Sequence, residues 1–409
     1  MKKIKFEYPV DTTLECVHDN WETTLPDYIK GNPSIDLNDR KLPVIRPEDF
    51  EGATIGAKVI AMNNFVLAAG GGFEMYFGNT STYLITQAIV LPSNTTVRIV
   101  DCTIQLADNT VDNMFRTANI VIDPEHPYGF ALNKDDMPPV YNVRIIGEQN
   151  PVLLMVNNTS QYGESTVGWR GHTIEFVGVS NFEIAGFKTE KNIAWQIALT
   201  GCSFGSVHDI EFHSTRDNGD GIDVEFGSHD IEIYNITGEC SDDAIAVSNS
   251  GPSRLVQRPV ELTRPTNPMD YGYRKFGEDT YNIRIYNAHV KNLADVVDII
   301  CGDYGIHHVS IADISDNNGT SQGATWACVV VFGGQYDGGY HHGLIHDVYI
   351  SGVSAYACGK AAIYLNGGVI QNCQINDVKL AEGQTLLLNE SGIDPADYNF
   401  TITNTGTIE

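Results

Sequence analysis

A short strand-like unit recurs along most of the chain and constrains the fold more than any other feature of the sequence. Each copy is a small or polar turn residue followed by an apolar-x-apolar run. Phe182, Ile210 and Ile231 begin such runs at intervals of about 21 to 28 residues, a period typical of one coil of a β-solenoid. Successive coils of a solenoid pair as parallel strands about 4.8 Å apart. The copies occupy residues 96–99, 142–145, 181–184, 208–212, 229–233, 282–285, 308–311 and 346–350.

Two other repeat-rich architectures fit the sequence less well. A leucine-rich repeat has a similar period, but its Leu-x-x-Leu-x-Leu signature is absent. A β-sandwich needs hairpins, and two-residue Asn-Gly or Asp-Gly loops do not pair these strands. We therefore predict an all-β fold, a right-handed single-stranded parallel β-helix that resembles the solenoid of pectate lyases.

A solenoid needs a cap where its first coil would otherwise be open. Residues 52–69 have helix-like spacing of apolar residues, stop at three glycines (70–72) and lead into the alternating run 73–77. We predict an N-terminal capping helix that feeds the first coil. The expected organisation is an N-terminal extension (1–51), a β-helix catalytic domain (52–395) with a loop insertion at 251–281, and a C-terminal tail (396–409).

Charge and composition exclude several classes of partner. The net charge is −27, from 52 acidic against 25 basic residues, so the surface repels nucleic-acid phosphates. No apolar stretch reaches the roughly 18 residues that a membrane span needs. The N-terminal lysines are not followed by the apolar run of a signal peptide, so we expect a cytoplasmic protein. The eight cysteines contain no CxxC pair and fit reduced core residues better than disulfides or a zinc site.

Aspartates precede several strands at one position of the repeat. We align Gln196–Leu199, Gly221–Val224, Ala244–Val247 and Val296–Ile299 on successive coils. The residues just ahead of these strands then form a column of Trp195, Asp220, Asp243 and Asp295, with Asp242 beside it and Asp223 and Asp298 on the same outward face.

Carboxylates crowded in this way suit acid–base chemistry. Mutual repulsion should raise the pKa of at least one of them, which could then act as an acid near neutrality. One to two coil spacings also cover the separation of about 6.5–9.5 Å that inverting glycosidases use. Two alternatives remain open: the aspartates merely cap backbone amides in turns, as we prefer for Asp223, or their oxygens hold calcium.

Two motifs in this region resemble those of glycoside hydrolase family 28, the polygalacturonase family. Asn218-Gly219-Asp220 is similar to the Asn-Thr-Asp turn of that family, and residues 241–247, Ser-Asp-Asp-Ala-Ile-Ala-Val, are similar to its Asp-Asp segment. The strand at 194–199 resembles the family's coil that precedes the first motif, and the predicted helix, the glycine turn and the run 73–77 resemble the family's N-terminal opening. The resemblance implies an inverting enzyme in which Asp242 is the general acid and Asp220 and Asp243 position and activate the water.

The chain departs from that family where the family binds a uronate. Ala294-Asp295-Val296 stands in place of Gly-His-Gly, and residues 329–331, three valines, stand in place of Arg-Ile-Lys. These losses argue against ordinary polygalacturonan, the pectin-like substrate. A neutral sugar, or an anionic group held by Arg274 and Lys275 of the insertion, fits better. A replacement base could come from His307, His308, His341 or His342. Trp195, Trp326 and Tyr364 either stack on sugar rings or form a packing ladder.

We therefore expect a glycosidase that uses Asp220, Asp242 and Asp243 and binds its substrate through Trp195, Asn218, Asp295, Asp298, Arg274 and Lys275. We expect a carbohydrate substrate, no cofactor, no metal, no nucleic acid and no membrane contact, with a homo-oligomer possible. The alternatives are a polysaccharide lyase or epimerase on the same scaffold, and a non-catalytic, glycan-binding phage tail-type β-helix.

Overall fold

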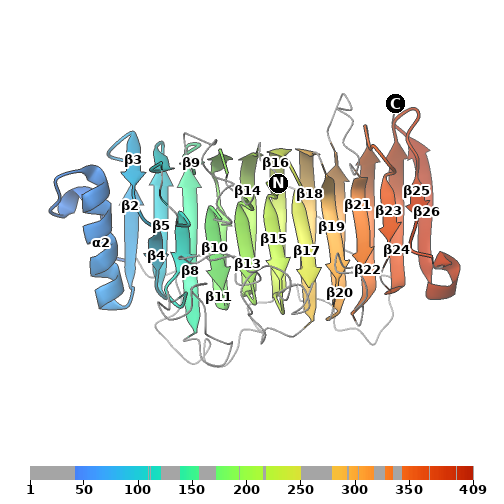
Figure 1. The fold of residues 1–409 in the computed structure, drawn as a ribbon, viewed down its shortest axis with the longest axis horizontal. Helices are drawn as coiled ribbons and strands as arrows, with labels where there is room; N and C mark the ends of the chain where they lie inside the picture. Colours follow the sequence, from blue (N-terminus) through green and yellow to red (C-terminus); the bar gives the residue numbers. More distant parts are fainter. Residues whose placement is uncertain are drawn as a thin grey trace.

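The predicted β-helix is confirmed by the computed structural model, in which parallel strands stack in coils along one long axis (Figure 1). The structure describes residues 42–108, 110, 112–120, 139–155, 172–192, 194–214, 218–249, 279–292, 294–302, 304–316, 328–334, 343–367, 369–392 and 394–408. In that part of the chain, strand pairing forms one sheet of 16 strands, sheet A, and one of 10 strands, sheet B. Each full coil contributes one strand to sheet B and one to sheet A, and the first coils add a second, short strand to sheet A.

Sheet A carries the longer strands. Its main path is β1 (Val44–Ile45), β2 (Phe73–Phe77), β5 (Thr95–Val100), β8 (Val140–Glu148), β11 (Val179–Ala185), β14 (Ser203–His213), β16 (His229–Cys240), β18 (Thr280–Asn292), β20 (Ile306–Ser315), β22 (Leu344–Ala355), β24 (Val369–Leu380) and β26 (Phe400–Thr407). Four strands pair beside this path: β3 (Thr82–Ile85), β6 (Thr103–Leu106), β9 (Val152–Leu154) and β12 (Lys188–Glu190).

Sheet B is built from short strands. In chain order they are β4 (Ile89–Leu91), β7 (Phe115–Thr117), β10 (Ile174–Val177), β13 (Ile197–Thr200), β15 (Ile222–Glu225), β17 (Ile245–Asn249), β19 (Asp295–Cys301), β21 (Cys328–Gly334), β23 (Ile363–Asn366) and β25 (Leu387–Asn389). Two 3-10 turns complete the described elements, η2 (Pro47–Asp49) and η6 (Pro395–Tyr398).

Columns of residues with positive φ bend the strands of sheet A. One column includes Asn142, Asn181, Asp230 and Asn282, with φ between 54° and 59°. Asn and Asp tolerate this left-handed conformation better than other residues with a side chain. Their side chains also bond along the stack: Asn181 Nδ2 donates to Asn142 Oδ1 at 2.5 Å, and Asn282 Nδ2 donates to Asp230 Oδ1 at 3.1 Å. The polar turn residues of the repeat are therefore bends, tied from coil to coil.

The register of sheet A corrects one part of the predicted repeat. Phe182 pairs with Gly205, and Gly205 with Ile231, whereas Ile210 pairs with Ile236. The unit at 208–212 therefore lies at a second column of bends and not beneath the units at 181–184 and 229–233. Both columns place a residue with positive φ before an apolar one, so the two bends look alike in the sequence.

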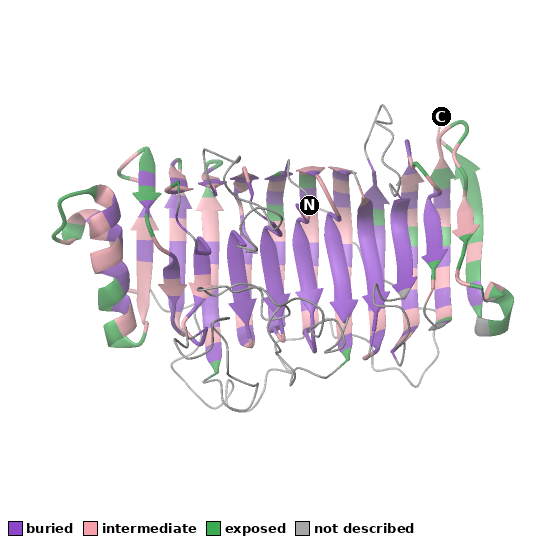
Figure 2. Cartoon of the chain, viewed as in Figure 1, coloured by how far each residue is buried: buried purple, intermediate pink, exposed green. Residues whose placement is uncertain are grey.

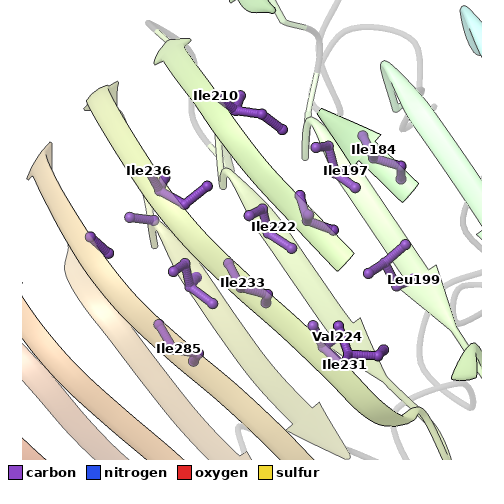
Figure 3. Close-up of a cluster of buried hydrophobic side chains, with 14 of the residues drawn as sticks. Ile184, Ile197, Leu199, Ile210, Ile222, Val224, Ile231, Ile233, Ile236 and Ile285 are labelled. Atoms are coloured by element: carbon purple, nitrogen blue, oxygen red, sulfur yellow. The ribbon is translucent and has the colours of Figure 1, made fainter. Parts of the chain in front are cut away.

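The core lies between the two sheets. Ile184, Ile210, Ile233 and Ile285 reach it from sheet A, and Ile222 with other aliphatic side chains reaches it from sheet B (Figure 3). These side chains are almost completely shielded from solvent, and burying each one contributes about 1.5–3 kcal/mol. Seven cysteines in the described part are free and six of them are buried, as predicted for core cysteines.

The predicted capping helix is α2 (Ile55–Ala69), at the end of the stack (Figure 1). Thr54 caps its first turn by accepting a bond from Ala57 N, and Gly70 ends it with φ 75°. Asn63 on its buried face bonds both backbone groups of Val90, at 2.7 and 3.0 Å. Val90 lies in β4, the terminal strand of sheet B, so the helix satisfies an edge that would otherwise be open.

The chain segments at the predicted domain boundaries join the stack. β1, within the predicted extension, pairs with β2, and β26, within the predicted tail, pairs with β24. Most of the predicted insertion lies outside the described residues. Strand β18 begins at Thr280, just before the end predicted for that insertion. Among the described residues, no helix has the length and apolar character needed to cross a membrane.

We expect the bend at Asn282 to show which property of Asn matters there. Asn282→Gly should lower the free energy of unfolding by about 1 kcal/mol, because the bond to Asp230 is lost but positive φ stays accessible. Asn282→Ala should cost about 1–2 kcal/mol more, because alanine also resists the left-handed conformation. Guanidinium unfolding midpoints of the two variants and the wild type measure this difference. Equal midpoints for Ala and Gly would show that the bend does not depend on φ.

Candidate active site

The candidate site lies on the outward face of sheet B. In β15, Ile222 and Val224 point into the core, and the alternation of a strand sends Asp223 and Glu225 to the opposite face. Strands β13, β15, β17 and β19 are nevertheless buried along their whole length (Figure 2). Polar side chains on this face are therefore shielded from water, which is unusual for acidic residues unless they are paired.

The predicted alignment of the four strands is confirmed by the register. Ile197 pairs with Ile222, Ile222 with Ile245, and Ile245 with Val297. The column ahead of the strands is held by backbone bonds from Gln196 N to Asp220 O (3.0 Å), from Gly221 N to Asp243 O (2.9 Å) and from Ala244 N to Asp295 O (2.8 Å). Asp220, Asp243 and Asp295 therefore lie on successive coils, as the sequence predicted.

These three carboxylates are buried, and Asp242 beside them is half-buried. The exposed fractions of Asp220, Asp243 and Asp295 are 5%, 7% and 5%. Among the described residues of β13, β15, β17, β19 and β21, none is Lys or Arg. Taking a carboxylate out of water is costly unless it is paired, and the described residues of these strands offer no cationic side chain of their own.

Asp243 and Asp295 share a hydrogen bond between their side chains. Burial raises the pKa of Asp243 to about 8, the charge of Asp242 adds to the rise, and hydrogen bonds from Asp295 oppose it. Burial and the charges of Asp243 and Asp298 raise the pKa of Asp295, although Cys328 N donates to its Oδ1 at 3.2 Å. The prediction that crowding raises at least one pKa is confirmed, and without a cation this pair holds a proton near neutrality.

Asp223 and Asp298 occupy equivalent positions two coils apart, with Ala246 between them. Each is 2% exposed, and burial is the largest cause of the rise in the pKa of each. Asp223 Oδ2 and Asp298 Oδ1 are buried oxygens without a hydrogen-bond partner. Asp298 belongs to a tighter group, because one oxygen from each of Asp243, Asp295 and Asp298 lies within 4.8 Å of the others.

The backbone just before β15 brings the coils close together. Asn218 is half-buried with φ 52°, and Gly221 follows Asp220 directly. A Cβ on Gly221 would lie 2.4 Å from Ala244 O and 2.8 Å from the ring of Phe212. Glycine is therefore required there if the coil with Asp220 is to pack against the coil with Asp243.

The aromatic candidates are packed rather than exposed. Trp195 is 5% exposed, stacks on His172 with ring centroids 5.3 Å apart, and belongs to a buried apolar cluster with Val177 and Phe226. Tyr364 is 1% exposed, and its hydroxyl donates to Glu390 at 2.5 Å. Their burial favours the packing alternative over sugar stacking. Trp326 lies outside the described residues.

His307 and His308 do not supply a base to the carboxylate column. His307 and His308 lie in β20 of sheet A, and His307 stacks between Tyr281 and His346 in a ladder along that sheet. The hypothesis that they replace the family histidine is therefore wrong, because their strand belongs to the other sheet. Arg274, Lys275, His341 and His342 lie outside the described residues.

Two buried acidic residues on this face were not predicted. Glu225 follows Asp223 by two positions and accepts a bond from Ser248 Oγ at 3.2 Å. Glu175 lies in β10, in register with Ala198 and Asp223, and is bonded by Asn113 Nδ2. Strand alternation around Asp223 would have identified Glu225, whereas Glu175 stands in a coil without an Asp motif. Both extend the acidic character of the face.

Comparison with known proteins identifies the fold. No family model matches the sequence, and no curated protein matches it. A polygalacturonase from Erwinia carotovora ssp. carotovora has a TM-score of 0.56 at 14% identity, over 89% of this chain and 98% of that one. A hyperthermoactive exopolygalacturonase from Thermotoga maritima has a TM-score of 0.53 at 15% identity, over 91% and 94%.

A phage protein has the same fold. A tailspike protein mutant of E. coli bacteriophage HK620, solved in complex with a pentasaccharide, has a TM-score of 0.55 at 14% identity. The match covers 92% of this chain but only 63% of the tailspike chain. At such identities the likeness shows the fold alone: a divergent polygalacturonase-like β-helix, as predicted from the sequence.

We expect Gly221→Ala to lower the free energy of unfolding by about 1–3 kcal/mol, because its methyl group meets backbone that cannot move without separating two coils. Gly333→Ala is the matched control on the same sheet, since its nearest atom would be 3.4 Å away, at Ile300. Thermal unfolding of both variants measures the difference. A Gly221→Ala midpoint equal to that of Gly333→Ala would contradict the close approach.

Proposed function

We propose that this protein is a glycoside hydrolase that cleaves O-glycosidic bonds of an oligo- or polysaccharide by an inverting, two-carboxylate mechanism. The observation that carries the proposal is the register of β15 with β17, which places Asp220 and the Asp242–Asp243 pair on adjacent coils. A pair of carboxyl groups flanking the bond is what most glycoside hydrolases use.

Each carboxyl group has a distinct task in this mechanism. Asp242, which is half-buried and so the more accessible of its pair, protonates the leaving oxygen. Asp220 and Asp243 position and activate the water that attacks the opposite face of the sugar. An inverting enzyme separates acid and base by about 6.5–9.5 Å to admit that water. Asp220 and Asp242 lie on adjacent coils and are offset by one residue along the chain, so their backbones are more than one coil spacing of about 4.8 Å apart.

The charge of the face points to a neutral sugar. The outward positions of β15, β17 and β19 include Asp223, Glu225 and Asp298, and no described residue of these strands is Lys or Arg. A uronate carboxylate would be repelled here, so ordinary polygalacturonan is a poor substrate. Hydroxyl groups, by contrast, donate hydrogen bonds to carboxylates. We therefore propose a neutral glycan.

A second candidate function is glycan binding without cleavage, favoured by the likeness to a tailspike solved with a pentasaccharide. A lyase is a third, which would need a positioned base. The sheet B strands β13, β15, β17 and β19 supply no Lys, Arg, Tyr or His among their described residues. The products distinguish the three: a hydrolase releases reducing ends, a lyase an ultraviolet-absorbing unsaturated sugar, and a binding protein neither.

The decisive experiment measures reducing-sugar release from a panel of neutral and uronic oligosaccharides. We expect release from a neutral glycan, with Asp242→Asn and Asp220→Asn each lowering kcat by about 10²–10⁴-fold, because each removes a proton-transfer group. The matched control is Asp313→Asn, the same chemical change on an exposed bend of sheet A, where asparagine also tolerates φ 54°.

Three outcomes would overturn parts of the proposal. Full activity in Asp242→Asn would exclude Asp242 as the acid. Cleavage of uronic substrates alone would show that the neutral-sugar argument is wrong. Tight glycan binding by calorimetry with no turnover by wild type would favour the tailspike-like function.

A further inference from the structure

We propose that Asp243, Asp295 and Asp298 form a binding site for a hard divalent cation, with Ca²⁺ the best fit. One carboxylate oxygen from each residue lies within 4.8 Å of the other two. All three side chains are buried, with exposed fractions of 7%, 5% and 2%. Three ionised carboxylates this close together and this well shielded from water repel one another strongly, so a shared positive charge would stabilise the group.

The hydrogen-bond partners described for these carboxylates are backbone N–H groups and one another. Asp295 Oδ1 accepts from Cys328 N, Asp243 bonds to Asp295, and the backbone N–H of Ile299 donates to Asp298. Within the described residues, no Lys, Arg or His is among these partners.

A second observation points to a ligand at the same place. Asp298 Oδ1 is buried and has no hydrogen-bond partner among the described residues, although leaving a buried acceptor unpaired is unfavourable. On the next coil Val331 is in register with Asp298, and a Cβ built on Gly333, two residues further along, would lie 3.9 Å from Asp298 Oδ1. Glycine therefore places no side chain against this oxygen from that position.

Ligand type and coordination geometry favour calcium over other ions. Calcium binds oxygens at about 2.3–2.6 Å, so two of its ligands lie at most about 4.6–5.2 Å apart. The three oxygens lie within 4.8 Å of one another, so one calcium ion could contact all three. Magnesium binds at about 2.0–2.1 Å and demands octahedral geometry, and zinc prefers nitrogen and sulfur ligands. Calcium accepts three protein oxygens with waters completing its shell.

The cation site shares Asp243 with the proposed catalytic groups, but it can be tested independently of their chemistry. Asp243 belongs to both, and a cation would keep it ionised, while Asp220 and Asp242 lie outside the group of three. Cation binding is measured without any glycan, so its test does not depend on whether the protein hydrolyses one.

The test compares two buried aspartates that differ mainly in their neighbours. Asp298→Asn removes one proposed ligand. Asp223→Asn is the control, because Asp223 is equally buried, also has an oxygen without a partner, and lies in the equivalent position two coils away, outside the group of three. Both variants remove a buried carboxylate, so both should fold at least as stably as the wild type without cation.

We expect the chelator-treated wild-type protein to bind Ca²⁺ in isothermal titration calorimetry and to melt at a higher temperature as Ca²⁺ is added. Asp298→Asn should lose at least 10-fold in Ca²⁺ affinity and most of the melting shift, whereas Asp223→Asn should keep both. Mg²⁺ should bind more weakly than Ca²⁺.

Other results would overturn the proposal. If millimolar Ca²⁺ gave the wild type neither a heat of binding nor a shift in melting temperature, the three carboxylates would bind protons and not the cation. An equal loss in Asp223→Asn would indicate general attraction to an acidic face. If circular dichroism showed that Asp298→Asn is unfolded, Asp295→Asn would serve as the test variant instead. Unchanged Ca²⁺ affinity in Asp295→Asn would also contradict the proposed site.

Discussion

The backbone hydrogen bonds between successive coils are the interaction on which the rest of this structure depends. Parallel pairing in register places each residue about 4.8 Å from its counterpart on the next coil, so that a residue type repeated at one position becomes a column. In sheet A the columns are favourable, because an amide such as Asn181 both donates and accepts along the stack. In sheet B the same pairing stacks Asp220, Asp243 and Asp295, whose charges repel.

The length and the bends of a strand decide how well its register could be predicted. Sheet B strands such as β13 and β15 are four residues long and their apolar pairs align in only one way, so the carboxylate column followed from the sequence. Sheet A strands bend at two columns with the same local pattern. His208-Asp209-Ile210 and His229-Asp230-Ile231 look equivalent, yet Asp209 lies at one bend and Asp230 at the other.

The burial of the outward face of sheet B could not be predicted from the sequence. Alternation predicts which side chains leave the core, and it placed Asp223 and Asp298 correctly on one face. It does not say whether that face meets water. Trp195 satisfied the spacing of a sugar platform but is packed against His172, and His307 belongs to the other sheet. Such outcomes depend on contacts between coils that are distant in sequence.

A buried acidic face couples the stability of this β-helix to what it binds. Each ionised carboxylate without a partner raises the free energy of the folded state, so protonation, a cation or a hydrogen-bonding sugar would each lower it. The polygalacturonases and the tailspike share the scaffold at 14–15% identity, so the fold alone does not determine which groups the outward face can bind. In this chain the stacked aspartates determine that property, because coil pairing holds their backbones about 4.8 Å apart.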